Sequence, residues 1–211
     1  GYTVKDKDSN IELDIENQYI MSPKDLCTVD FLDRFLDAGV RVLKIEGRAR
    51  SADYVKRVVE CYDEALRAIE EGTYTPERAE QWKERLRTVF NRGFWGGYYM
   101  GARAGEWSRT YGSSATVRKV YVGKVTNYFA RIGVIELQVE AAPLSVGEPV
   151  FLTGETTGVV EFVVEEIRVA LKPVQEAPQG VLCSIKVPTL IRRGDKLFKT
   201  VPSDEKADRN R

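Results

Sequence analysis

The stretch "VRVLKIEGRARSADYV" (residues 40–55) decides the fold of the first half of the chain. Its apolar beginning, residues 40–45, is typical of a buried β-strand, and Ser51 can cap a helix that starts directly afterwards. Between the two lies a turn, residues 44–50, whose neighbours are built for burial although the turn itself is charged. Its charged side chains are those of Lys44, Glu46, Arg48 and Arg50.

A similar unit precedes this stretch. Residues 17–21 favour a short strand, and residues 22–27 favour the start of a helix, because Ser22 can cap it and Pro23 suits the first helical position. Gly39 is expected to end that helix as a left-handed cap. Strand, helix, strand and helix with short connections predict parallel strands joined by right-handed crossovers.

Two further helices show the same local signals. The helix that begins at Ser51 is expected to end at Gly72, and a third helix is expected to begin at Thr75–Pro76. The predicted buried stripe of the first of these helices consists of Val55, Val58, Val59, Tyr62, Leu66 and Ile69.

The pattern changes in the second half. Residues 1–114 form the α/β part and end in a segment rich in aromatic residues and glycine, residues 91–101. Residues 115–201 predict a small antiparallel β-barrel, because short strands alternate there with Gly and Pro. The expected strands are residues 119–128, 131–139, 148–154, 159–169, 181–187 and 195–200. Residues 202–211 are charged, lack apolar anchors and are expected to be disordered.

Composition excludes several classes of function. Lys plus Arg and Asp plus Glu number 32 each, so a globally basic surface for nucleic acid is absent. The sequence has no histidine, so this chain alone cannot form a Ser-His-Asp triad, a Cys-His pair or an H-E-x-x-H zinc site. No apolar run approaches membrane-spanning length. Three distant cysteines indicate a reducing, cytoplasmic setting.

The charged turn supplies the candidate site. Ligands of parallel α/β folds bind beyond the carboxyl ends of the strands, where residues 22–27 and 44–50 are both expected to lie. Lys44, Glu46 and Arg48 are then candidate catalytic groups, and Arg48 suits a carboxylate or phosphate because its fork binds bidentately. In the alternative interpretation, Glu46 and an arginine form a structural ion pair.

Cys27 is the candidate metal ligand. Its expected place in the first turn of a helix favours metal or redox chemistry, because the helix dipole lowers the pKa of a thiol there. The alternative is a small buried apolar residue. Because the sequence has no C-x-x-C pair, this chain by itself offers no complete cluster or zinc site.

The segment "YIMSPKDLCTVDFLDRFLDAGVRVLKIEGRARSADYV" (residues 19–55) closely resembles peptidase family U32. The family's characteristic run is N-S-K-D-L-C followed by a helix and K-I-E-G-R, and "FNRGFWGGYY" (residues 90–99) resembles its R-G-F segment. Ser22–Pro23 replaces the usual Asn-Ser, and Trp95 replaces the usual Ser or Thr. The resemblance covers residues 11–201 and implies the C-terminal portion of such a protein. That portion consists of the last strand–helix units of a (βα)8 TIM-like barrel and a small β-barrel, and the latter also resembles domain two of elongation factor Tu.

The resemblance implies three possible functions. Some relatives hydroxylate RNA bases, notably the wobble uridine of tRNA, through a prephenate-derived route with a [4Fe-4S] cluster that other parts of the protein hold. Lys24, Asp25, Arg48 and Arg50 would then bind substrate, Cys27 could approach the cluster, and Arg192, Arg193 and Lys196 could help to dock RNA or form a solvated turn.

The second possibility is a collagenase-like peptidase that uses Asp25 and Glu46 as paired carboxylates. The third is a non-catalytic binding module. Half of a barrel would expose strand edges, so the expected partners are the missing N-terminal half of the barrel or further copies of the chain.

Overall fold

The computed structural model describes residues 2–5, 7, 12–15, 22–102, 105–108 and 112–203, and the side chains of residues 13–15 are not described. The chain divides into two compact units, residues 1–116 (the N-terminal unit) and residues 117–211 (the β-domain). The predicted strand at residues 17–21 lies outside the described residues. Of the tail predicted to be disordered, residues 202–211, Pro202 belongs to a strand, and residues 204–211 lie outside the described residues.

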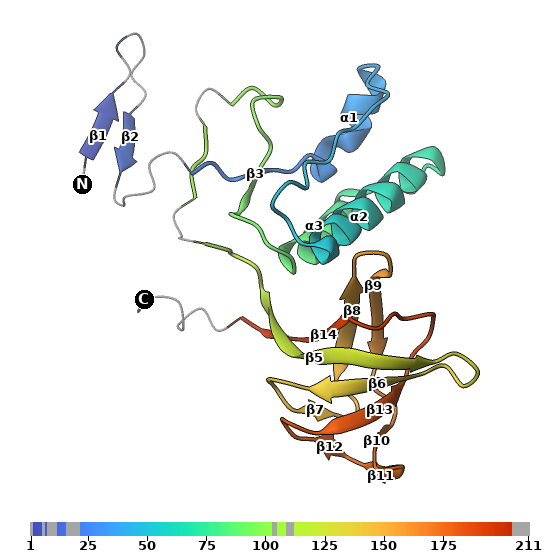
Figure 1. Cartoon of the computed structure of the whole chain (residues 1–211). Coiled ribbons are helices and arrows are strands. Elements are labelled where there is room, and N and C mark those ends of the chain that lie inside the picture. Colours follow the sequence, from blue (N-terminus) through green and yellow to red (C-terminus); the bar gives the residue numbers. More distant parts are fainter. Residues whose placement is uncertain are drawn as a thin grey trace. The chain divides into compact units, whose positions relative to one another are not determined.

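The described part of the N-terminal unit contains short strands and three α-helices (Figure 1). Its elements are β1 (Tyr2–Lys5), β2 (Glu12–Ile15), β3 (Asp25–Leu26), a 3-10 helix (Val29–Phe31), α1 (Leu32–Asp37), α2 (Ala52–Glu70), α3 (Pro76–Arg87) and β4 (Phe94–Trp95). β1 and β2 pair antiparallel, whereas β3 and β4 pair in parallel although almost seventy residues of sequence separate them.

One apolar core joins α2 and α3 to the segment that follows β3. Its buried residues are Cys27, Val29, Leu32, Val58, Cys61, Ala65, Ala68, Ala79, Trp82 and Leu86. The predicted buried stripe of α2 is confirmed for Val58, which is buried, and for the three later residues, which pack against this core: Tyr62, Leu66 and Ile69. It is wrong for Val55 and Val59, which are 37% and 46% exposed. Cys61 and two alanines take the buried positions instead, since their small side chains allow α3 to approach closely.

The sequence signals correctly predicted where α1 and α2 end and where α3 begins. Gly39 and Gly72 follow the ends of α1 and α2 with φ of 90° and 67°. At the start of α3, the hydroxyl of Thr75 accepts a hydrogen bond from the Arg78 N–H (3.3 Å), and Pro76 occupies the first helical position. These predictions are confirmed. Ser51 also occupies the N-cap position of α2 as predicted, but its side chain forms no capping hydrogen bond.

The prediction of a helix at residues 22–27 is wrong. Pro23 forms a β-bridge with Trp107, and the backbone N–H groups of Asp25 and Cys27 donate to the carbonyls of Gly93 and Trp95 (both 2.9 Å). These distant partners satisfy the backbone groups that a helix would have used. Helical structure therefore begins only at Val29.

The prediction of a buried strand at residues 40–45 is also wrong. Val42 is 84% exposed, and in the described part of the chain no strand pairs with this segment. A strand needs hydrogen-bonded neighbours, and an apolar run by itself does not supply them. The segment instead leads into the charged turn without regular secondary structure.

The β-domain is built from antiparallel strands, as predicted. Its main sheet has the order β11-β10-β13-β6-β5-β14-β8-β9, and β7 pairs with β12 beside it. The strands are β5 (Val117–Phe129), β6 (Val134–Val139), β7 (Leu144–Ser145), β8 (Pro149–Gly154), β9 (Gly158–Val163), β10 (Ile167–Val169), β11 (Lys172–Val174), β12 (Glu176–Ala177), β13 (Leu182–Lys186) and β14 (Lys196–Pro202).

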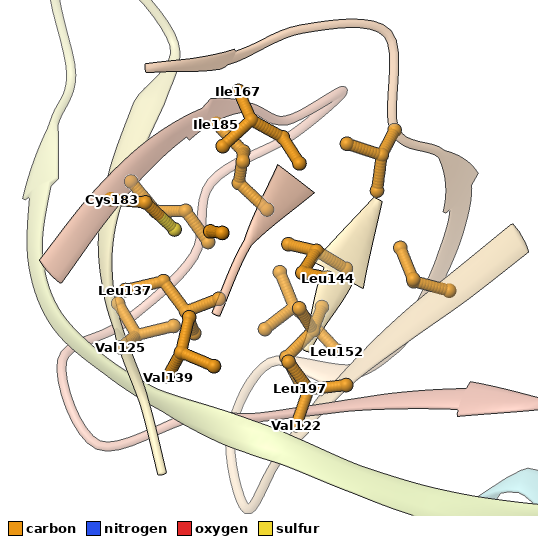
Figure 2. Packing of buried hydrophobic residues seen from close by; sticks show 14 of the residues in the cluster. Val122, Val125, Leu137, Val139, Leu144, Leu152, Ile167, Cys183, Ile185 and Leu197 are labelled. Carbon is orange, nitrogen blue, oxygen red and sulfur yellow. The ribbon is translucent and has the colours of Figure 1, made fainter. Parts of the chain in front are cut away.

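Every stretch predicted as a strand in this domain contains one, and residues 159–169 are divided between β9 and β10. Figure 2 shows the aliphatic side chains of these strands directed into one shared core. Alternation explains this core, because Ile135, Leu137 and Val139 on β6 point inward while the residues between them are less buried.

Candidate functional site

The turn at residues 44–50 is closed by its own polar groups. The Glu46 carboxylate accepts a hydrogen bond from the Arg48 N–H (2.8 Å), and the Arg50 N–H donates to the Gly47 carbonyl (3.0 Å). Ala49, with φ of 60°, is the residue that adopts the left-handed conformation. Gly47 has a different role, because a Cβ there would lie 3.0 Å from Cγ2 of Val55 on α2. The glycine thus lets the turn approach the helix closely.

Asp25 connects three segments that are distant in the sequence. One of its carboxylate oxygens accepts a hydrogen bond from the Arg50 guanidinium (3.0 Å), and the other accepts from the backbone N–H of Arg92 (3.0 Å). The side chains of Arg50 and Asp25 are only 16% and 22% exposed. Three segments therefore meet at this carboxylate, namely residues 24–27, the turn at residues 44–50 and residues 91–94.

Aromatic rings hold Arg50 from its other sides. Its guanidinium lies 4.2 Å from the ring centroid of Phe90 and 5.2 Å from that of Tyr54. Such cation–π contacts strengthen when the cation is partly desolvated, as it is here. A structural ion pair does brace the turn, but Arg50 and Asp25 form it, whereas Glu46 caps the turn itself.

The remaining charged groups of the turn are exposed. In the part of the chain that the structure describes, neither the Arg48 guanidinium nor the Lys44 ammonium forms an ion pair. Lys24, by contrast, binds Glu106 (2.5 Å). Of the four residues predicted to bind substrate, Lys24, Asp25 and Arg50 have partners within the unit, and only Arg48 presents an unoccupied charged group.

Sequence reasoning missed the residues that complete this arrangement. Tyr54 follows Arg50 by four positions, and this spacing at the start of a predicted helix was a usable signal. Phe90, the Arg92 N–H and Glu106 reach the site from distant segments, and no local pattern indicates them.

Cys27 lies in the apolar core rather than in a helix. It is 4% exposed, and its N–H is bound to β4. Burial raises the pKa of its thiol, contrary to the lowering expected from a helix N-terminus. Among the described residues, no three His, Cys, Asp or Glu side chains are grouped as metal ligands would be. These residues therefore do not fit an iron–sulfur cluster, and we derive no chemistry from one.

We expect all three cysteines to resist modification in the folded chain. They are buried, and burial raises the pKa of Cys61 and Cys183 to about 11, so their thiolates are scarce at neutral pH. Labelling with a maleimide near neutral pH, read by mass spectrometry, should give no adduct natively and three in guanidinium. Rapid native labelling of Cys27 would contradict this assignment of the thiol to the core.

The family model of peptidase family U32 matches residues 1–109, which include all three segments that meet at Asp25. The chain belongs to peptidase family U32. No helix among the described residues is long and apolar enough to cross a membrane.

Individual relatives carry different names. A protein of Porphyromonas gingivalis named collagenase is 56% identical over 199 residues, which are 94% of this chain and 48% of that protein. The tRNA hydroxylation protein P2 of Bacillus subtilis is 31% identical over 88 residues, 40% of this chain and 28% of its own length. The chain thus spans about half the length of the Porphyromonas relative.

Among solved structures, the C-terminal domain of a Geobacillus thermoleovorans protein of the same family matches 37% of this chain. The match covers 96% of that domain, with 18% identity and a TM-score of 0.36.

Proposed function

We propose that this chain is part of a protein that hydroxylates tRNA, forming 5-hydroxyuridine, and that Arg48 binds an anionic group of the substrate. The proposal rests on the different environments of two arginines in the same turn. Arg50 is fixed by Asp25 and by two aromatic rings, whereas Arg48, two residues away, extends its guanidinium from the braced turn into solvent. A planar guanidinium on a rigid support suits bidentate binding of a phosphate or carboxylate.

The architecture we infer for the N-terminal unit is the end of a (βα)8 barrel. It is supported by the parallel pairing of β3 with β4 and by the helices that follow β3 in the sequence. In such barrels, functional side chains lie after the carboxyl ends of strands. Residues 44–50 would take that place if residues 40–45, which are not a strand in the described fold, pair with strands from the remainder of the barrel. Val42, Ile45, Val55 and Val59 are exposed apolar residues that the remainder of a barrel would cover.

The chain's own acids and bases favour this proposal over hydrolysis. The Asp25 carboxylate is bound by Arg50 and by the Arg92 N–H, so it is not available as a general acid or base. Glu46 is exposed and bound to its own turn, and the sequence has no histidine. Because neither carboxylate is placed to act as a general acid or base, we infer that the turn binds and orients an anion. A [4Fe-4S] cluster, if the full-length protein holds one, would depend on other residues.

The test uses a strain in which the full-length gene is deleted. Nucleosides from its tRNA should lack 5-hydroxyuridine derivatives, and the gene supplied on a plasmid should restore them, as measured by mass spectrometry. Unchanged nucleosides in the deletion strain would refute the proposal.

A peptidase is the second candidate, because the 56% identical relative is named collagenase. In that case Arg48 would bind a carboxylate of the peptide. Cleavage of a collagen peptide by the purified full-length protein, and normal nucleosides in the deletion strain, would favour this candidate.

A further inference from the structure

Two lysines face each other across neighbouring strands of the β-domain. Lys124 on β5 and Lys196 on β14 are paired residues in the antiparallel register, and both are exposed. The Cβ atoms of such a pair lie about 5 Å apart, and like charges placed directly opposite destabilise a sheet. In the described residues neither lysine forms an ion pair.

The surroundings of this pair contain no compensating carboxylate within the strand row. On the outer sides of the pair, Lys124 lies opposite Gln138 of β6, and Lys196 lies opposite Thr153 of β8. The exposed Arg193 belongs to the turn that leads into β14. The next residue, Gly194, donates its N–H to the carbonyl of Val125 (2.9 Å), the neighbour of Lys124. Among the described residues, Glu155 in the β8–β9 turn forms no hydrogen bond or ion pair with Lys124 or Lys196.

The nearest acid in the sequence is occupied elsewhere. Asp195 is only 6% exposed, and its carboxylate accepts hydrogen bonds from the Thr157 hydroxyl (2.6 Å) and the Arg192 N–H (2.9 Å). The Arg192 guanidinium also contacts Thr157. Lys199 on the same strand shows the contrast, because it is bound by Glu148 at 2.7 Å. The β-domain therefore neutralises Lys199, whereas Lys124 and Lys196 have no ion-pair partner among its described residues.

The neighbouring aromatic residues are packed against one another. Phe198 follows Lys196 by two positions and so shares its face of β14. Its ring lies 5.4 Å from the ring of Phe151, nearly parallel to it, and 5.4 Å from the ring of Tyr121. Farther along this face, Glu161 lies opposite Phe151, and Glu140 accepts a hydrogen bond from the Tyr121 hydroxyl (2.5 Å). In the row that contains the lysine pair, the charged groups are the two ammonium groups, which suit phosphate.

We propose that Lys124 and Lys196, together with Arg193, bind phosphate groups of an RNA backbone. Two ammonium groups on paired residues can donate to one phosphate, and this anion would remove the repulsion that the free sheet tolerates. The inference rests on the proposed function, since it takes RNA as the partner. Because phosphate carries no sequence information, the contact should be independent of base sequence.

The test is salt-dependent binding of a fluorescently labelled tRNA transcript to the full chain, followed by anisotropy over a series of KCl concentrations. The Lys124→Gln/Lys196→Gln variant should lower the slope of log affinity against log salt by about 2, roughly one unit for each lysine. The matched control is Lys172→Gln/Lys186→Gln, which removes the same charge from exposed positions of the same domain and should leave the slope unchanged. Thermal unfolding should show the first variant to be at least as stable as the wild type.

Four results would overturn the inference. The first two are unchanged RNA affinity in the Lys124→Gln/Lys196→Gln variant and an equal loss of slope in both double variants. The others are the absence of salt-dependent binding by the wild type, and displacement of RNA by polyglutamate that is as effective as displacement by polyphosphate at equal charge. Different results would refute this inference and the proposed function. Unchanged RNA affinity in the first variant removes this site alone, whereas normal 5-hydroxyuridine in the deletion strain refutes the proposed function.

Discussion

Replacing Asp25 by alanine is expected to lower the free energy of unfolding of the N-terminal unit by about 3 kcal/mol. The substitution removes both hydrogen bonds of the carboxylate, to Arg50 and to the Arg92 N–H, and each bond to a charged group contributes about 1.5–3 kcal/mol. We expect the lower end of that range because the carboxylate is 22% exposed. Arg50 would remain between two aromatic rings without its counter-ion.

Urea unfolding followed by tryptophan fluorescence measures this effect selectively, since Trp82, Trp95 and Trp107 all lie in the N-terminal unit. Asp37→Ala on α1 is the control, because it removes an exposed acid and should change stability by less than about 0.5 kcal/mol. Asp25→Asn, which keeps one acceptor oxygen, should fall between the two. Equal stability of Asp25→Ala and Asp37→Ala would show that the three segments do not depend on this carboxylate.

Replacing Gly123 by alanine is expected to destabilise the β-domain by about 3 kcal/mol. A Cβ at this position would overlap the backbone carbonyl oxygen of Gln138 on β6, and it would also lie 3.1 Å from the Cα of Val139. Backbone atoms within a paired strand cannot move aside as a side chain can, so the strands must separate locally. β5 is irregular here, because its register with β14 shifts between Leu197 and Phe198.

Far-ultraviolet circular dichroism during thermal unfolding should show an earlier transition for the Gly123→Ala domain, while the tryptophan transition of the N-terminal unit stays in place. Arg118→Ala, on the exposed part of the same strand, is the control and should unfold like the wild type. A Gly123→Ala transition equal to that of the control would mean that β5 and β6 do not approach as closely as described.

Features with local causes could be predicted from the sequence. The hydroxyl of Thr75 and the ring of Pro76 set the start of α3 by themselves, and Gly72 supplies the left-handed residue that ends α2. The strands of the β-domain could also be predicted, because alternation along β6 and turns rich in Gly indicate short antiparallel strands. Their order could not, since β13 pairs with β6 and β14 pairs with β5, which are distant in the sequence.

Features with distant causes could not be predicted. Residues 22–27 carry helix-start signals, yet Gly93 and Trp95 draw Asp25 and Cys27 into a parallel strand pair. In the charged turn, spacing alone could not decide whether Arg48 or Arg50 is the structural arginine. That depends on Asp25 and Phe90, which approach from two other segments.

The most direct test of the account is the Arg48→Ala substitution in the full-length gene, with tRNA nucleosides measured by mass spectrometry. We predict loss of 5-hydroxyuridine derivatives at normal protein level, because Arg48 has no partner in the described fold to lose. Arg41→Ala is the matched control. It removes an arginine whose guanidinium donates to the Leu36 and Val40 carbonyls in the same region, and it should leave the nucleosides unchanged. Normal 5-hydroxyuridine in the Arg48→Ala strain would contradict the assignment of the turn to RNA hydroxylation.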